Sequence, residues 1–165
     1  MKRTSTIRLR PMQLDDIEIV VELEQQLFET PWDRLRFQRS LERQQPAWVA
    51  LSNSPEPSEF PVGYLVASSG GGVADLLTIG VSPKCQRSGI AAQLLAQLLT
   101  QLQSQQVQEL FLEVRVSNEA AIGFYRANGF EQVGVRRNYY RRPATPDEAE
   151  GREDGLLFKR ELTQG

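Results

Sequence analysis

Hydrophobic residues along this chain follow two spacings, one typical of strands and one typical of helices. Alternating or continuous apolar stretches predict seven strands, at Thr6–Arg10, Ala47–Leu51, Pro61–Ser69, Val73–Val81, Leu110–Val116, Phe130–Tyr140 and Gly155–Leu162. Apolar residues spaced three and four apart predict four helices, at Leu14–Phe28, Trp32–Arg43, Gly89–Ser104 and Asn118–Gly129. Polar stretches rich in glycine or proline predict the connections, among them Ser52–Phe60, a turn at Gly70–Gly72 and a charged loop at Arg141–Asp154.

The predicted order of elements defines the fold class. It runs strand, two helices, three strands, helix, strand, helix, two strands, without an internal repeat or a linker. This order is typical of an α/β (α+β) fold, a mixed central sheet of about seven strands flanked by about four helices. A length of 165 residues suits one domain, which we expect to span residues 1–165.

Composition excludes several kinds of chemistry. The chain has no histidine and one cysteine, Cys85, which removes Ser–His–Asp catalysis, Cys–His catalysis and histidine or cysteine metal sites, so no metal is expected. Acid–base chemistry is left to carboxylates, Tyr, Lys, Cys or water. The formal net charge of −2 argues against direct nucleic-acid binding, which needs a basic face.

The N-terminal residues give no sign of a targeting segment. They begin with Lys2 and Arg3 but no apolar stretch follows, unlike a secretory signal. No stretch approaches the roughly 18 apolar residues of a membrane span. With a single cysteine, these features predict a cytoplasmic protein with no membrane partner.

The segment from Val81 to Ala92 predicts a phosphate site. A buried strand ends there, and a turn with Gly89 opens a long amphipathic helix, whose first N–H groups have no helical partner. Gly89 lets an oxygen approach the backbone, and Arg87 adds a positive charge. An ordinary strand-to-helix turn is the alternative interpretation, and neither a Walker loop nor a dinucleotide fingerprint is present.

This segment, Gln86-Arg87-Ser88-Gly89-Ile90-Ala91, resembles the Q/R-x-x-G-x-G/A acyl-CoA motif of the GNAT acetyltransferases, whose element order also matches. The resemblance implies acetyl-CoA as cosubstrate. It implies that backbone groups of six residues hold the pyrophosphate, namely Arg87, Ser88, Gly89, Ile90, Ala91 and Ala92. It further implies that the backbone of Ile79, Gly80 and Val81 pairs with the pantetheine amides. Ala91 stands where glycine is commoner in the family.

Glu113 lies in the middle of the apolar strand predicted over Leu110–Val116. Burying an unpaired charge is costly, so this carboxylate must pair, protonate or face a cleft. One interpretation is a salt bridge with Arg115, two residues along and therefore on the same face of the strand.

A longer string links Glu113 to Tyr125. The residues from Leu112 to Tyr125, followed by Gly129-Phe130, resemble the L-E-V-R-x-S-N-x-x-A-I-x-x-Y…G-F segment of the RimI-type ribosomal-protein alanine N-acetyltransferases. Further matches to that family are Pro31-Trp32, Arg136-Arg137-Asn138-Tyr139-Tyr140 and Gly151-Arg152-Glu153-Asp154. The resemblance implies that Glu113 is the general base, that Tyr125 is the general acid and that Asn118 contacts the cofactor.

The resemblance also implies an acceptor, the N-terminal alanine of a basic small-subunit ribosomal protein. Eight acidic residues are candidates to attract such a tail, with a solvated surface as the alternative; they are Glu24, Glu29, Asp33, Asp147, Glu148, Glu150, Glu153 and Asp154. Two other functions stay open. One is a GNAT enzyme for a different protein or small-molecule amine, and the other is a non-catalytic acyl-CoA-binding module.

Overall fold

A computed structural model describes residues 7–52 and 59–162 of the chain. Its strands are β1 (Ile7–Pro11), β2 (Ala47–Ser52), β3 (Phe60–Gly70), β4 (Val73–Val81), β5 (Glu109–Arg115), β6 (Glu131–Arg142) and β7 (Gly151–Glu161). Its helices are α1 (Ile17–Leu27), α2 (Arg34–Glu42), α3 (Ile90–Ser104) and α4 (Glu119–Ala127), with short 3₁₀ turns at Leu14–Asp16 and Pro83–Cys85. The mixed fold of seven strands and four helices that the sequence predicts is confirmed.

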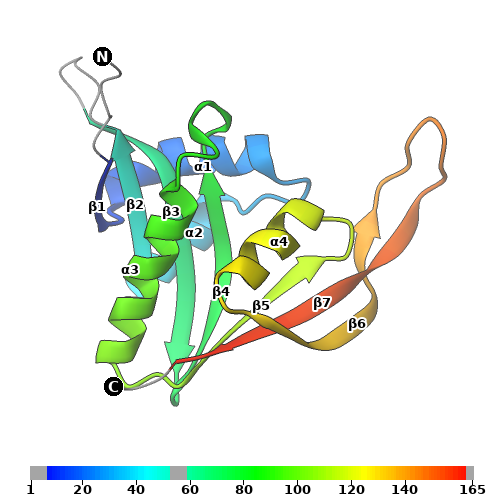
Figure 1. Ribbon diagram of the computed structural model, residues 1–165. Helices are drawn as coiled ribbons and strands as arrows, with labels where there is room; N and C mark the ends of the chain where they lie inside the picture. The colour runs from blue at the N-terminus through cyan, green and yellow to red at the C-terminus, as the bar shows by residue number, and fades with distance from the viewer. Residues whose placement is uncertain (1–6, 53–58, 163–165) are drawn as a thin grey trace.

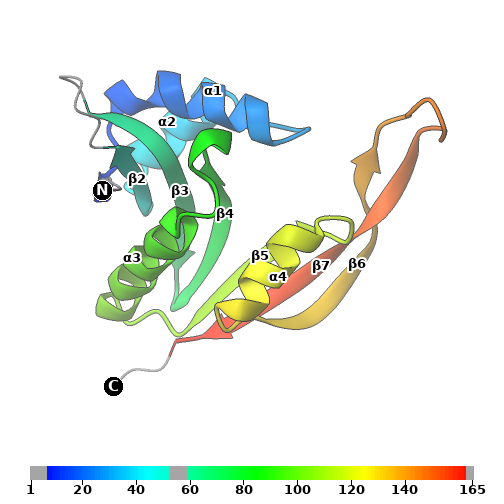
Figure 2. The same cartoon turned by 45° about the horizontal axis from the view of Figure 1, so that its top comes forward.

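All seven strands form one sheet in the order β1-β2-β3-β4-β5-β7-β6. Neighbouring strands are antiparallel except for β4 and β5, which are parallel. Their pairing is short, because only Val73–Asp75 of β4 faces Glu109–Phe111 of β5. Beyond these residues the two strands diverge and leave a gap in the middle of the sheet (Figures 1 and 2).

Helices cover the sheet on both faces, and each face has its own core. Helices α3 and α4 pack on one face, where the larger core runs from Ala50 across to Phe158. Helices α1 and α2 pack on the opposite face over strands β2 and β3, around Phe37 and Tyr64. Strand β4 therefore lies between a layer formed by α3 and α4 and a layer formed by α1 and α2.

Most predicted boundaries agree with the structure within two or three residues. Strand β4 is predicted without error at Val73–Val81, and the stripe of α3 is buried from Ile90 to Leu102. Thr6 of the first predicted strand and residues 53–58 of the Ser52–Phe60 loop lie outside the described residues.

The prediction of a loop over Arg141–Asp154 is wrong at both ends. Strands β6 and β7 continue as a long hairpin in which Arg141 pairs with Arg152 and Arg142 with Gly151, so only residues 143–150 connect them. Charged side chains suit these strands because the hairpin projects beyond the helices into solvent (Figure 1). Ion pairs of Arg141 with Glu150 and Arg142 with Glu148 join its two sides near the tip.

Within the described part of the chain, the helices are too short or too polar to span a bilayer. The same residues contain no group of three or more histidine, cysteine or acidic side chains placed to hold a metal ion.

Candidate active site

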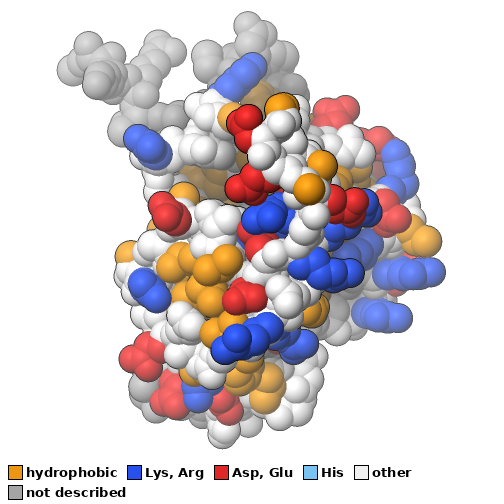
Figure 3. All heavy atoms as spheres, turned by 90° about the vertical axis from the view of Figure 1, so that its right-hand side faces the viewer, with side chains coloured by type: hydrophobic (Ala, Val, Ile, Leu, Met, Phe, Trp, Pro, Cys, Tyr) orange, Lys and Arg blue, Asp and Glu red, His pale blue; other side chains and the backbone are white. Residues whose placement is uncertain are grey.

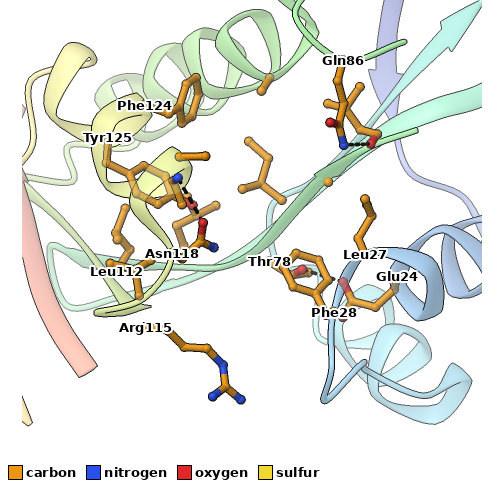
Figure 4. A pocket seen from close by; sticks show the side chains of 18 of the residues that line it. Glu24, Leu27, Phe28, Thr78, Gln86, Leu112, Arg115, Asn118, Phe124 and Tyr125 are labelled. Carbon is orange, nitrogen blue, oxygen red and sulfur yellow. Dashed lines mark hydrogen bonds between the residues drawn. The ribbon is translucent and has the colours of Figure 1, made fainter. Parts of the chain in front are cut away.

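A cavity of about 870 Å³ occupies the gap between β4 and β5 (Figure 4). Its walls come from the far halves of both strands, the start of α3, helix α4 and the connection between α1 and α2. It opens where the sheet loses its pairing, so backbone groups as well as side chains face into it. Every residue predicted for the site lines this cavity except Ser88.

The loop before α3 presents a row of free backbone donors. No N–H from Gln86 to Ala92 has an acceptor in the described part of the structure; the first bond of the helix is Gln93 N–H to the Gly89 carbonyl. Arg87 and Gly89 both adopt left-handed backbone conformations, with φ of 63° and 82°, which curls the loop around these amides. A Cβ built on Gly89 would meet nothing within 4 Å, so the backbone is uncrowded at this residue.

Side chains hold this loop in its shape. The Gln86 amide donates to the Val81 carbonyl at 3.2 Å, and the Ser88 hydroxyl donates to the Cys85 carbonyl. The Ser88 hydroxyl is therefore engaged within the loop itself. An anion held by free amides at a helix N-terminus gains from both the donors and the helix dipole.

Strand β4 offers an unpaired edge to the cavity. Its pairing with β3 contains a bulge, because Val66 pairs with Thr78 and Ala67 with Leu76, which leaves Leu77 as the extra residue. From Leu76 to Val81 the side of β4 that faces β5 has no strand partner among the described residues. Such an edge can pair with an extended ligand by backbone hydrogen bonds.

Asn118 caps helix α4 from the cavity wall. Its side-chain oxygen accepts from the Ala121 N–H at 3.2 Å, as the sequence predicts for an N-cap (Figure 4). Its side-chain amide N–H groups have no partner in the described part of the chain.

Tyr125 stands on α4 with its ring held by neighbouring aromatics. The ring packs edge-on against Phe124 and Phe130, with ring centres 5.4 Å and 5.6 Å away. The residue is only 8% exposed, yet its hydroxyl has no hydrogen-bond partner and is not a fully enclosed atom. The hydroxyl therefore opens to the cavity, and burial of the ring raises the pKa of Tyr125 to about 12.

Glu113 pairs with an arginine that the sequence did not indicate. Its carboxylate contacts the Arg136 guanidinium on β6 at 2.7 Å, while Arg115 contacts Glu153 at 3.2 Å. The interpretation of a Glu113–Arg115 bridge is thus wrong, because β7 and β6 bring other partners to this face of the sheet. Glu113 keeps a quarter of its side-chain surface exposed. Burial of the Tyr140 side chain, and to a smaller extent the negative charge of nearby Glu113, raise the pKa of Tyr140 to about 12.

Glu113 and Tyr125 reach the gap from opposite faces of the sheet. Leu112 and Val114 of β5 pack in the α3–α4 core with Tyr125, so Glu113 between them points to the other face. Both line the same cavity because the strands have separated at this height.

The candidate acidic surface is mostly engaged in the protein's own contacts. Glu148, Glu150 and Glu153 pair with arginines, and basic and acidic side chains are interspersed on this side of the molecule (Figure 3). Asp33 caps α2, and Asp154 accepts from the Asn138 N–H. Glu24 is buried, and Glu29 alone of the exposed acids lines the cavity.

Sequence reasoning missed the cavity wall formed by α1 and by the connection to α2. In that wall, the cavity is lined by Leu27, Phe28 and Thr30. Tyr140 lines the cavity from strand β6. One signal was available: Glu24 occupies a position in the apolar stripe of its helix, which is unusual for a carboxylate.

The sequence matches the acetyltransferase (GNAT) family over residues 17–130. The chain belongs to this family and is an acetyl-CoA-dependent N-acetyltransferase.

Two relatives and one solved structure show how far the similarity extends. The [ribosomal protein bS18]-alanine N-acetyltransferase of Escherichia coli K12 is 32% identical over 147 residues, 89% of this chain and 92% of that protein. The N-alpha-acetyltransferase RimI of Mycobacterium tuberculosis is 35% identical over 144 residues, 84% of this chain and 87% of that protein. The crystal structure of the E. coli ribosomal-protein-S18-alanine N-acetyltransferase superposes with a TM-score of 0.81 at 27% identity, covering 97% of this chain and 96% of that one.

The buried Tyr125 should make folding sensitive to alkaline pH. Its pKa lies near 12 when folded and about 10 when unfolded. Since the folded value is higher, the stabilisation is complete below pH 10 and is lost as pH rises from 10 to 12. The two-unit difference corresponds to about 3 kcal/mol in the free energy of unfolding.

Urea unfolding at several pH values tests this expectation. Between pH 10 and 12 the free energy of unfolding should fall less steeply for Tyr125→Phe than for the wild type. The control Tyr139→Phe, which removes an exposed hydroxyl, should follow the wild-type profile; an unchanged decline in Tyr125→Phe would contradict the burial.

Proposed function

We propose that this chain acetylates the N-terminal amine of a protein, and that its acceptor is the N-terminal alanine of a basic small-subunit ribosomal protein. The observation that carries the proposal is the gap between β4 and β5, with free amides at one end and Glu113 and Tyr125 on opposite faces. The activities of the relatives point to the acceptor. We infer that residues 1–165 act as one domain, in the cytoplasm and without direct contact to nucleic acid.

The chain's residues fit acetyl-CoA along the α3–α4 side of the gap. The N–H groups from Arg87 to Ala92 suit a pyrophosphate, and the open edge at Ile79, Gly80 and Val81 suits the amides of the pantetheine arm. The free side-chain amide of Asn118 donates to the same ligand. Bound acetyl-CoA supplies the thioester that an amine can attack directly, so no covalent enzyme intermediate is needed.

Glu113 acts as the general base on the opposite side. An α-amine has a pKa near 8, so about a tenth is neutral at pH 7, and a carboxylate acting directly or through water is a sufficient base. The Arg136 guanidinium holds the Glu113 carboxylate at the mouth of the gap, and half-exposed Arg136 can turn aside when an amine arrives.

Tyr125 acts as the general acid. Its pKa of about 12 keeps the hydroxyl protonated at neutral pH. The hydroxyl is unpartnered and open to the cavity, so it can donate a proton to the departing sulfur.

The acceptor enters between two segments that face each other on the Glu113 side. Phe28 and Thr30 follow α1, while Tyr140 lies on the β6–β7 hairpin. Arg115 lies between them, with its guanidinium 3.4 Å from the Thr30 hydroxyl and stacked 4.6 Å from the centre of the Tyr140 ring. The polar and aromatic side chains of these two segments suit contact with an extended polypeptide end.

An acetylation assay tests the acceptor. The purified protein should consume acetyl-CoA with a basic peptide that begins with alanine, and mass spectrometry should find the acetyl group on the α-amine. The control is the same peptide with its α-amine already acetylated, which should give no consumption even when it contains lysine. Acetylation of lysine would support a different amine acceptor. Tight CoA binding without turnover on any amine would support a non-catalytic module.

The role of Glu113 is tested by replacing its carboxylate with the amide of glutamine. Glu113→Gln should lower kcat about 10²–10⁴-fold, the usual contribution of general acid–base catalysis. Glu109→Gln is the matched control, since Glu109 lies on the same strand and also pairs with a cation, Lys159 at 3.2 Å. Glu109→Gln should keep wild-type kcat. Equal kcat values for the two variants would refute the assignment.

The role of the α3 amides is tested by closing the space in front of them. Gly89→Val should raise the KM for acetyl-CoA about tenfold or more, because the side chain occupies the open approach to the N–H groups. Gly72→Val is the control, since Gly72 has the same φ of 82° and the same open surroundings but lies in the β3–β4 turn. It shares the backbone strain and should leave KM unchanged. A normal KM in Gly89→Val would mean that the phosphates bind elsewhere.

A further inference from the structure

Glu24 is a buried carboxylate that the proposed reaction does not use. It sits in the apolar stripe of α1, is 2% exposed and lines the cavity beside Thr78 (Figure 4). Within the described residues, no lysine or arginine forms an ion pair with its oxygens. A carboxylate buried without a cation has to be stabilised by hydrogen bonds alone.

Three donors from three different segments provide that stabilisation. One carboxylate oxygen accepts from the Tyr64 hydroxyl at 2.8 Å and from the Thr78 hydroxyl at 2.7 Å. The other accepts from the backbone N–H of Trp32 at 2.9 Å. Glu24 thereby joins β3, β4 and the chain just before α2 at one point.

The network lies directly against the part of β4 that borders the cavity. Thr78 follows the bulge residue Leu77, so its hydrogen bond fixes the strand where its register changes. Two residues later, a Cβ on Gly80 would lie 2.5 Å from the Tyr64 hydroxyl oxygen and 2.7 Å from Leu27. The backbone at Gly80 therefore rests on the Tyr64 side chain that Glu24 holds.

The third hydrogen bond reaches the other wall. Trp32 ends the connection after α1 in which Phe28, Glu29 and Thr30 line the cavity. Its ring packs on Phe37 at 5.2 Å between centres, and Arg36 stacks on it at 4.2 Å. Glu24 thus connects this wall to strand β4.

Packing alone does not require a charge here. A buried ionic group is often replaceable by apolar side chains of similar volume without loss of stability, whereas hydrogen bonds to a fixed carboxylate define the positions of their donors. We propose that Glu24 is a positioning residue: it holds the β4 backbone at residues 78–80 at a set distance from the connection at residues 28–32. On the proposed function, these are the walls that hold the thioester and the acceptor.

Such a role predicts a loss of rate with little loss of cofactor affinity. The pyrophosphate is held by the amides of α3, which are not part of this network. A displacement of about 1 Å between reacting groups can cost on the order of 100-fold in rate.

The test replaces Thr78, because valine keeps its shape and removes only the hydroxyl. Thr78→Val should lower kcat about 10–100-fold, while the KM for acetyl-CoA and the Kd for CoA change by less than about threefold. Thr78→Ser restores the donor and should recover most of the rate. Glu24→Gln, which cannot accept from all three donors, should show the same pattern as Thr78→Val.

The matched control is Thr100→Val, which removes a hydroxyl that bonds to the Ala96 carbonyl on α3 far from the network. It should keep the wild-type kcat. Wild-type kcat in Thr78→Val, or a loss that Thr78→Ser does not recover, would overturn the proposal. So would a loss matched by weaker CoA binding, because that result would indicate general damage to the site.

Hydrogen exchange separates this inference from the proposed function. In the CoA complex, Thr78→Val should exchange faster than the wild type at residues 78–81 and 28–32, whichever amine the enzyme acetylates. Unchanged exchange at both segments would overturn the positioning role. Failure of the wild type to acetylate an alanine N-terminus would count against the acceptor alone.

Discussion

The separation of β4 from β5 is the constraint on which the rest of this structure depends. Two parallel strands that stayed paired would close the sheet and leave no cavity at its centre. Here three residues of each strand pair, and the remainder is held apart by different supports. Strand β4 is held by β3 and by α1, through the hydrogen bonds of Glu24, whereas β5 is held by β7 along its whole length. The opening is therefore a built feature of the sheet, maintained by packing on both sides.

This opening places groups of opposite character around one point. The α3 side contributes backbone N–H groups and the positive end of a helix, which suit an anion. The opposite side contributes Glu113, Arg115 and Tyr140, which are side chains with polar or charged ends. The hydroxyl of Tyr125 enters from α4 with its ring in the core, so its proton is retained and its position is fixed. These groups come from four elements, α3, α4, β5 and β6, and only the gap brings them together.

The sequence was sufficient for the fold and for the part of the cavity lining that comes from the end of β4, the start of α3 and the cap of α4, because those features follow from local patterns. The apolar run of β4, the apolar stripe of α3 and the Asn118 cap can each be predicted from a few neighbouring residues.

The partner of Glu113 could not be predicted in this way, since Arg136 reaches Glu113 only through the pairing of β6 with β7 and of β7 with β5. The length of the hairpin was misjudged for a related reason. The residues by which the two strands extend into the predicted loop, Arg141–Arg142 and Gly151–Asp154, carry no apolar side chain, so they lack the alternation that marks a strand against a core. Glu24 shows the limit most clearly: its place in an apolar stripe was visible, but its three donors come from residues 8, 40 and 54 positions away.

The cavity between β4 and β5 is lined by residues from both faces of the sheet, and this affects the order in which substrates can bind and products can leave. On the proposed function, acetyl-CoA would lie along α3 and a polypeptide end beside the hairpin, on different faces of the sheet, and the two would meet in the gap between β4 and β5. Neither would have to leave before the other arrived, so both could be present during transfer, as a direct attack requires. After transfer the two products could depart independently, each from the face on which it came.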